Sequence, residues 1–203
     1  MRTVTTETRV YLFDELSSRA KEAARDWWKR LDEMESYFSE YVIDDAKEIA
    51  AIMGIEIAEI YWSGFSCQGD GASFTGSYSN KEGAAQAVRE YAPQDETLHR
   101  IVDTLTRLQT GADSELCADI KNDRGCRYVH EYSVDITAGL ATDSREITDS
   151  EESETIEALR DFMRWIYRQL EGSYYDSRSD DSVDENIRIN GYEFTENGDF
   201  FNG

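Results

Sequence analysis

The sequence predicts an α+β fold in which a central antiparallel sheet of about four strands, with a C-terminal hairpin, packs against several amphipathic helices. Three observations favour this class. Apolar residues recur at helical spacing along several segments, and short runs rich in Ile, Tyr and Trp have the composition of strands. Near the C-terminus, Asn190-Gly191 stands between alternating apolar residues, which is a strong hairpin signal.

Residues 1–110 are predicted to form four helices and three strands. Trp27 and Leu31 continue an alanine-rich stripe on the first helix, and Gly54 is a natural end for the second. Pro93 ends the third helix, because the residue before a proline disfavours the helical region. In order, we expect a strand at 9–13, helices at about 14–33 and 39–53, strands at 55–65 and 72–78, and helices at 84–91 and 95–108.

The remaining residues are predicted to add two hairpins and one long helix. The first hairpin joins strands at 115–120 and 126–136 through a turn at 122–125. A linker of small and polar residues at 137–148 leads to a helix at about 149–171, then to a polar, acidic loop at 174–185, and the last hairpin joins 187–189 to 192–194. We expect a single domain over 1–203, with a possible subdivision near 138–148.

Charge is the most unusual property of the chain. It carries 43 Asp and Glu against 21 Lys and Arg, a formal net charge of -22 on 203 residues. Small domains usually stay within about 8 charges of neutrality. Aromatic residues make up 12% of the chain, which is too many for a disordered acidic tail. The sequence therefore indicates a folded protein with a strongly acidic surface.

The acidic residues are concentrated towards the C-terminus. Residues 143–203 hold 17 Asp and Glu against 6 Arg, a net charge of -11 and half of the total. Such a surface repels phosphate backbones and attracts basic proteins, and carboxylates spaced along a helix and loop approximate the line of charge of duplex DNA. The candidate partner-binding residues are Glu151, Glu152, Glu154 and Glu157 on the predicted helix and Asp176, Asp180, Asp181 and Asp184 on the predicted loop. The alternative is an acidic surface that serves only solubility or adaptation to high salt.

A second candidate site is the glycine-rich connection between two predicted strands. Consecutive glycines permit positive φ angles and backbone N–H groups that can cradle an anion. The segment matches neither a Walker A loop nor an EF-hand loop. A tight corner that serves only packing is the alternative to a small-anion or nucleotide site in the loop 66–71, whose candidate residues are Gln68, Gly69, Asp70 and Gly71.

No catalytic, metal or cofactor site stands out in the sequence. With 43 acidic residues, no carboxylate pair can be singled out for acid–base chemistry. Three cysteines without CxxC spacing, Cys67, Cys117 and Cys126, are typical of free thiols in a reducing compartment. The chain has no apolar run of a membrane span, and its first residues lack the apolar segment of a signal peptide. We therefore expect a non-enzymatic cytoplasmic protein without metal, cofactor or membrane contact.

Three segments of the chain are distinctive: the run 11–17 with the alanines that follow it, the aromatic and glycine-rich segment 60–74, and the ending 192–198. Together they resemble a family of small acidic proteins from phages and prophages. Members of that family are sometimes labelled as antitoxins of toxin–antitoxin stability systems. The resemblance implies a phage origin and the cytoplasm of a bacterial host.

Together, the charge and the resemblance predict an inhibitor of a host defence protein that handles nucleic acid, of the anti-CRISPR or anti-restriction type. We expect its acidic surface to mimic DNA and to occupy a basic nucleic-acid site, with no direct contact to nucleic acid. Two alternatives remain open at this point. One is an antitoxin that sequesters a basic toxin, and the other is the small-anion or nucleotide-binding protein that uses the loop 66–71.

Overall fold

The structure is a computed structural model that describes residues 1–2, 7–32, 37–110, 115–122, 128–142 and 145–202. The chain forms two compact units. The first combines Met1–Ser39 with Gly172–Gly203, and the second is Glu40–Glu171. The segment 138–148, where the sequence indicated a possible subdivision, lies inside the second unit.

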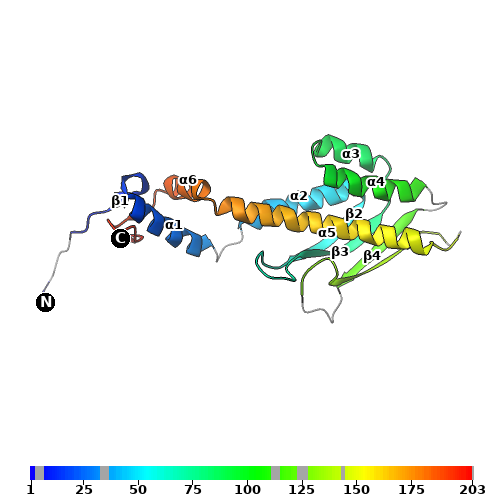
Figure 1. Cartoon of the computed structure of the whole chain (residues 1–203), viewed down its shortest axis with the longest axis horizontal. Helices are drawn as coiled ribbons and strands as arrows, with labels where there is room; N and C mark the ends of the chain where they lie inside the picture. The colour runs from blue at the N-terminus through cyan, green and yellow to red at the C-terminus, as the bar shows by residue number, and fades with distance from the viewer. Residues whose placement is uncertain (3–6, 33–36, 111–114, 123–127, 143–144, 203) are drawn as a thin grey trace. The chain divides into compact units, whose positions relative to one another are not determined.

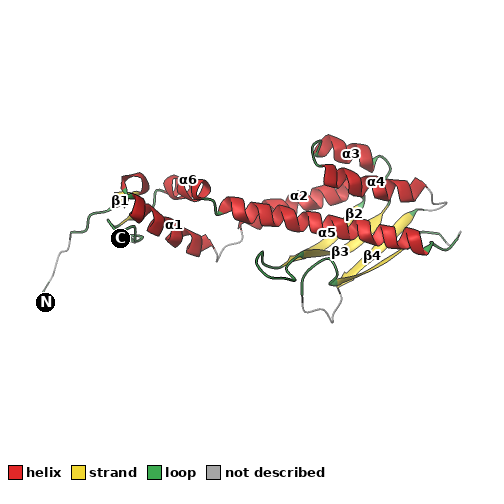
Figure 2. Ribbon diagram, viewed as in Figure 1, coloured by secondary structure: helices red, strands yellow, loops and turns green. Residues whose placement is uncertain are grey.

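A four-stranded antiparallel sheet forms the centre of the second unit. Its strands are β2 (Ile55–Trp62), β3 (Ala72–Ser79), β4 (Leu116–Asn122) and β5 (Val134–Leu140), and they lie in that order across the sheet. The helices that accompany them are α2 (Tyr37–Met53), α3 (Ala84–Tyr91), α4 (Glu96–Thr110) and α5 (Asp149–Ser177). Figure 2 shows these helices gathered on one side of the sheet.

The core of the second unit lies between that side of the sheet and the helices. Phe74 and Tyr78 of β3 and Phe162 and Ile166 of α5 are all at most 2% exposed. The apolar stripes expected at 39–53 and 95–108 face this core, and helices α2 and α4 confirm both of those predictions. The α+β class and the four-stranded antiparallel sheet packed against helices are therefore confirmed.

The first unit is built from both parts of its split sequence. Strand β1 (Tyr11–Leu12) pairs antiparallel with β6 (Glu193–Phe194), and helix α1 (Ser18–Asp32) packs with α6 (Asp180–Asn190) around Phe13, Val183 and Ile187. A Cβ on Gly198 would lie 2.1 Å from the carbonyl oxygen of Ala20, so only glycine permits this close approach of the C-terminal residues to α1.

In the small C-terminal sheet, strand β6 pairs with a different strand from the predicted one. Residues 187–189 do not form a strand, because they belong to helix α6. Ser179 caps this helix by accepting a hydrogen bond from the N–H of Ser182, and Gly191 ends it in the left-handed conformation at φ +63°. The Asn-Gly pair therefore marks a helix end, not a hairpin turn, and β6 pairs instead with a strand from the N-terminus.

Two further boundaries differ from the prediction. Helix α5 continues past Gly172 to Ser177, where Tyr174 packs edge-on against Phe38, and α6 covers most of the remaining predicted loop at 174–185. The partner of β4 is β5 at 134–140, part of which was predicted to be a linker, because the chain turns at His130–Ser133 before it enters the sheet. The predicted turn residues 123–125 lie outside the described residues.

Candidate functional site

The first candidate set lies on the opening turns of helix α5, where Glu151 closes the helix N-terminus. The Thr148 hydroxyl accepts a hydrogen bond from the Glu151 N–H (3.3 Å), while the Glu151 carboxylate accepts one from the Thr148 N–H (2.9 Å). This reciprocal pair is a capping box. Arg145 also donates two hydrogen bonds to the same carboxylate, at 2.6 and 2.9 Å, and these bonds lower the pKa of Glu151 to about 2.

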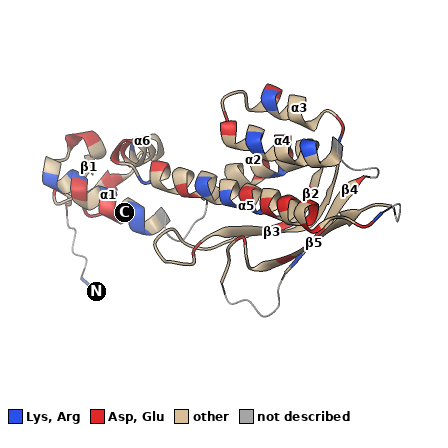
Figure 3. Ribbon diagram, turned by 45° about the vertical axis from the view of Figure 1, so that its right-hand side comes forward, with Lys and Arg blue, Asp and Glu red and all other residues tan. Residues whose placement is uncertain are grey.

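The next carboxylates along α5 are also held by arginines. Glu154 accepts a hydrogen bond from Arg107 of α4, which lowers the pKa of Glu154. Glu157 accepts one from Arg164 at 2.7 Å. Figure 3 shows basic residues interleaved with acidic ones along α5. Three of the four helix candidates are therefore ion-paired within the chain, and Glu152 is the one without an ion pair among the described residues.

Arg164 organises this part of the second unit. Its guanidinium reaches Glu131 at 2.9 Å, Asp161 at 2.8 Å and the Tyr132 hydroxyl at 2.9 Å, in addition to Glu157. The contacts with Glu131 and Tyr132 hold the turn before β5 against helix α5. The carboxylates that surround Arg164 therefore have a structural role, and their charge is partly neutralised.

The second candidate set lies in the first unit, on the end of α5 and on α6. Asp184 is only 9% exposed and accepts two hydrogen bonds from Arg25 of α1, at 2.6 and 2.7 Å. Asp180 pairs with Lys29 at 3.0 Å, which lowers its pKa, and with Arg25 at 3.4 Å. Asp176 and Asp181 are exposed, and no ion pair of either is found in the described part of the chain. Asp184 thus secures α6 on α1 and is not a surface charge.

The glycine loop holds a carboxylate of its own in the expected anion cradle. The Asp70 side chain accepts hydrogen bonds from the N–H groups of Ser66 (2.9 Å) and Cys67 (2.7 Å), and these bonds lower its pKa. Gly69 adopts φ +110° in the tight turn, and the Gly71 N–H donates to the Ser63 hydroxyl. The N–H groups of Ser66, Cys67 and Gly71 are therefore engaged within the loop, and Gln68 is left exposed at the tip of the turn.

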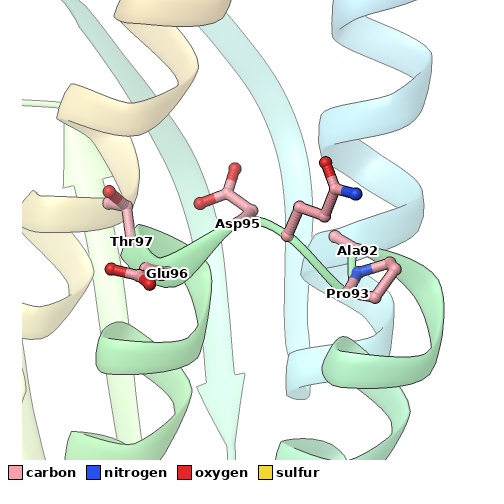
Figure 4. A pocket seen from close by; sticks show the side chains of 6 residues that line it. Ala92, Pro93, Asp95, Glu96 and Thr97 are labelled. Carbon is pink, nitrogen blue, oxygen red and sulfur yellow. The ribbon is translucent and has the colours of Figure 1, made fainter.

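A shallow pocket lies at the corner between α3 and α4, lined by residues 92–97 (Figure 4). Its most central acid, Asp95, caps α4 by accepting from the Leu98 N–H at 3.0 Å. The other oxygen of Asp95 accepts from the Trp165 indole N–H at 2.7 Å. Both carboxylate oxygens are thus engaged in the fold. Within the described ranges, no group of three or more His, Cys, Asp or Glu side chains is arranged to hold a metal ion.

No pattern in the sequence indicates a site on the side of the sheet that faces away from the helices, here called the outer face. A β-bulge at Ala58 determines which side chains reach it. Glu56 lies opposite Ser77 and Glu59 opposite Thr75, so these two glutamates, three positions apart, share one face. A regular strand would place them on opposite faces. Spacing in the sequence therefore gave no signal for this arrangement.

Among the described strand residues, the outer face carries four exposed carboxylates and one lysine. In the register of the sheet, Asp119 lies beside Ser77, and Lys121 lies beside Asp135. One row of this face thus runs from Glu56 through Ser77 to Asp119, and the other has Glu59 and Thr75 on one side and Lys121 and Asp135 on the other. The charged residues of the outer face are Glu56, Glu59, Asp119, Lys121 and Asp135.

The chain belongs to a family described as a domain of unknown function (DUF8835), which matches residues 38–180. That range covers the second unit and continues into the first. No curated protein and no solved structure matches the chain. No helix in the described part of the chain is both long enough and apolar enough to span a membrane.

Proposed function

We propose that this protein binds a basic protein that handles nucleic acid and competes with nucleic acid for its site. The observation that carries the proposal is the excess of carboxylates. The second unit alone contains 27 Asp and Glu against 12 Lys and Arg, a net charge of -15. Each basic residue carries only one positive charge, so ion pairs within the unit leave its net charge unchanged.

The ion pairs also narrow the set of residues that can meet a partner. A carboxylate already held by an arginine, such as Glu151 or Asp184, is partly neutralised and attracts a cation of a partner less strongly than a free carboxylate does. Reversing such a residue to lysine would place it against an arginine and would damage the fold as well as the surface. Of the eight candidates, Glu152, Asp176 and Asp181 remain as free carboxylates of the described surface.

The proposed setting is the cytoplasm of a bacterial host cell, in keeping with the resemblance to phage and prophage proteins. There the protein acts as an inhibitor of a nuclease or defence complex, without chemistry of its own. Binding is fast and sensitive to salt, since attraction between opposite charges steers the encounter. The Asp70 carboxylate in the glycine loop favours this proposal over anion or nucleotide binding by that loop.

A capture experiment tests the proposal. The full chain is immobilised, exposed to a bacterial lysate at about 50 mM salt, and washed with a DNA duplex or with polyglutamate of equal charge. We expect a basic protein to be retained and to be released by the duplex at far lower concentrations than by polyglutamate. A retained protein that DNA does not displace would contradict competition with nucleic acid and would favour sequestration of a basic toxin.

A further inference from the structure

We propose that the outer face of the sheet is the surface on which the basic partner docks, with Arg or Lys side chains of the partner placed against its carboxylates. This inference rests on the proposed function and assigns it a site. The helices α2, α3, α4 and α5 leave this face uncovered in Figures 1 and 3. The strand residues that point to it are small, hydroxyl-bearing or charged, whereas those that point the other way form the core.

The charges on the outer face are unbalanced. Four carboxylates stand against Lys121, which lies 3.4 Å from Asp119. The side chains of that pair are 74% and 65% exposed, so the pair contributes little and leaves Asp119 accessible. No ion pair of Glu56 or Asp135 is found among the residues described. In contrast, the acids on the opening turns of α5 are mostly held by arginines.

The carboxylates are spaced for separate cations. Glu56 and Glu59 lie opposite residues two apart on β3, which places the two rows about 7 Å from each other along the strands. Asp119 lies two strands from Glu56 in the same row, at about 10 Å. Each carboxylate can therefore receive its own guanidinium or ammonium group.

Polar groups between the carboxylates complete the binding surface. Ser77 lies between Glu56 of β2 and Asp119 of β4, and Thr75 lies beside Glu59, so their hydroxyl oxygens can accept further N–H groups of an arginine. The Tyr61 hydroxyl donates to Glu59 at 2.6 Å and fixes the position of that carboxylate. A rigid, pre-positioned carboxylate loses less conformational entropy on binding than a mobile one.

Charge complementarity selects a basic protein segment as the occupant. A second copy of this chain would bring like charges together, and the phosphates of nucleic acid would be repelled for the same reason. The uncovered face is also too polar for an apolar partner. An arginine- and lysine-rich surface satisfies both the carboxylates and the hydroxyl groups.

The test compares two charge-matched double variants of the full chain. E56K/D135K changes the outer face, and D44K/E90K makes the same change in net charge on exposed positions of α2 and α3. The probe is a fluorescent dodecapeptide of arginine, lysine and serine, titrated at about 50 mM salt. Circular dichroism and thermal unfolding check that both variants stay folded.

We expect E56K/D135K to weaken binding of the peptide at least tenfold and D44K/E90K to weaken it less than threefold. K121E should strengthen binding, because it replaces a cation on the outer face with a further carboxylate. Equal losses for the two double variants, or no gain from K121E, would overturn the assignment of the site while leaving the proposed function. A wild-type chain that does not bind the peptide at all would overturn both.

Discussion

Among individual residues, Arg25 and Asp184 form the least exposed ion pair described here, with side chains 22% and 13% exposed. Removing one member of a buried pair leaves an uncompensated charge, which is more costly than losing a surface pair. We expect Arg25→Ala to lower the free energy of unfolding of the first unit by about 3 kcal/mol. Urea denaturation followed by tryptophan fluorescence, to which Trp27 and Trp28 of the first unit contribute, measures this loss.

The matched control for Arg25 is Lys29 on the same helix. It pairs with Asp180, whose side chain is 61% exposed, so Lys29→Ala should cost about 0.5 kcal/mol. If both variants lost the same stability, the burial of Asp184 would not be the reason for the effect.

Glu151 predicts a dependence of stability on pH. Its pKa is lowered from 4.5 to about 2 in the folded chain, because Arg145 and Thr148 donate hydrogen bonds to the ionised form. A lowered folded-state pKa stabilises the protein fully above the unfolded pKa, and the contribution disappears as the pH falls from 4.5 towards 2. Thermal unfolding of the wild type and Glu151→Gln should therefore differ at pH 6 and converge near pH 2. A difference that stays constant over this range would contradict the role of the ion pair.

At the scale of single elements, the sequence patterns correctly predicted the helices that bury an apolar stripe in the core. Helix α4 illustrates this, because its apolar residues at helical spacing all face the core. The same patterns failed where one signal has two meanings. Asn190-Gly191 fits a hairpin turn and a helix end equally well, and the decision comes from Val183 and Ile187, which are buried against α1 and its neighbours.

The candidate site was predicted only in part, because charge in the sequence does not show which charges are paired. Arg107 is 47 residues from Glu154 and Arg25 is 159 residues from Asp184, so neither pairing has a local signal. The outer face was missed for a related reason. Its two glutamates on β2 share a face through the bulge at Ala58, which depends on how β2 pairs with β3.

Strand β2 approaches β3 so closely next to the bulge that replacing Gly76 of β3 should destabilise the fold. A Cβ at this residue, where φ is +150°, would lie 1.9 Å from the Glu56 carbonyl oxygen. We expect Gly76→Ala to cost about 3 kcal/mol or more, because β2 must shift or the backbone must strain. Gly139→Ala on β5 is the control, since nothing lies within 4 Å of its added Cβ. Guanidine denaturation of both variants measures the difference, and a well-tolerated Gly76→Ala would contradict the close approach of β2.

For the whole molecule, the two units have separate cores. The buried cluster of the second unit runs from Ala46 to Leu170, and that of the first unit draws on Phe13–Ala24 and Val183–Phe194. A fragment of residues 38–180, the range of the family match, should therefore fold alone and unfold cooperatively. Near-ultraviolet circular dichroism during heating tests this, with the full chain as reference. A fragment without a cooperative transition would show that the second unit depends on the first.

The split sequence of the first unit has a consequence for synthesis on the ribosome. Strand β1 cannot pair with β6, and α1 cannot pack with α6, until the 132 residues from Glu40 to Glu171 have been made. At 5–20 residues per second this takes roughly 7–26 s. During that time the second unit can fold as it emerges, whereas Phe13 and Trp27 have no partner to cover them. The N-terminal segment thus keeps apolar side chains exposed on the nascent chain until the C-terminal residues emerge.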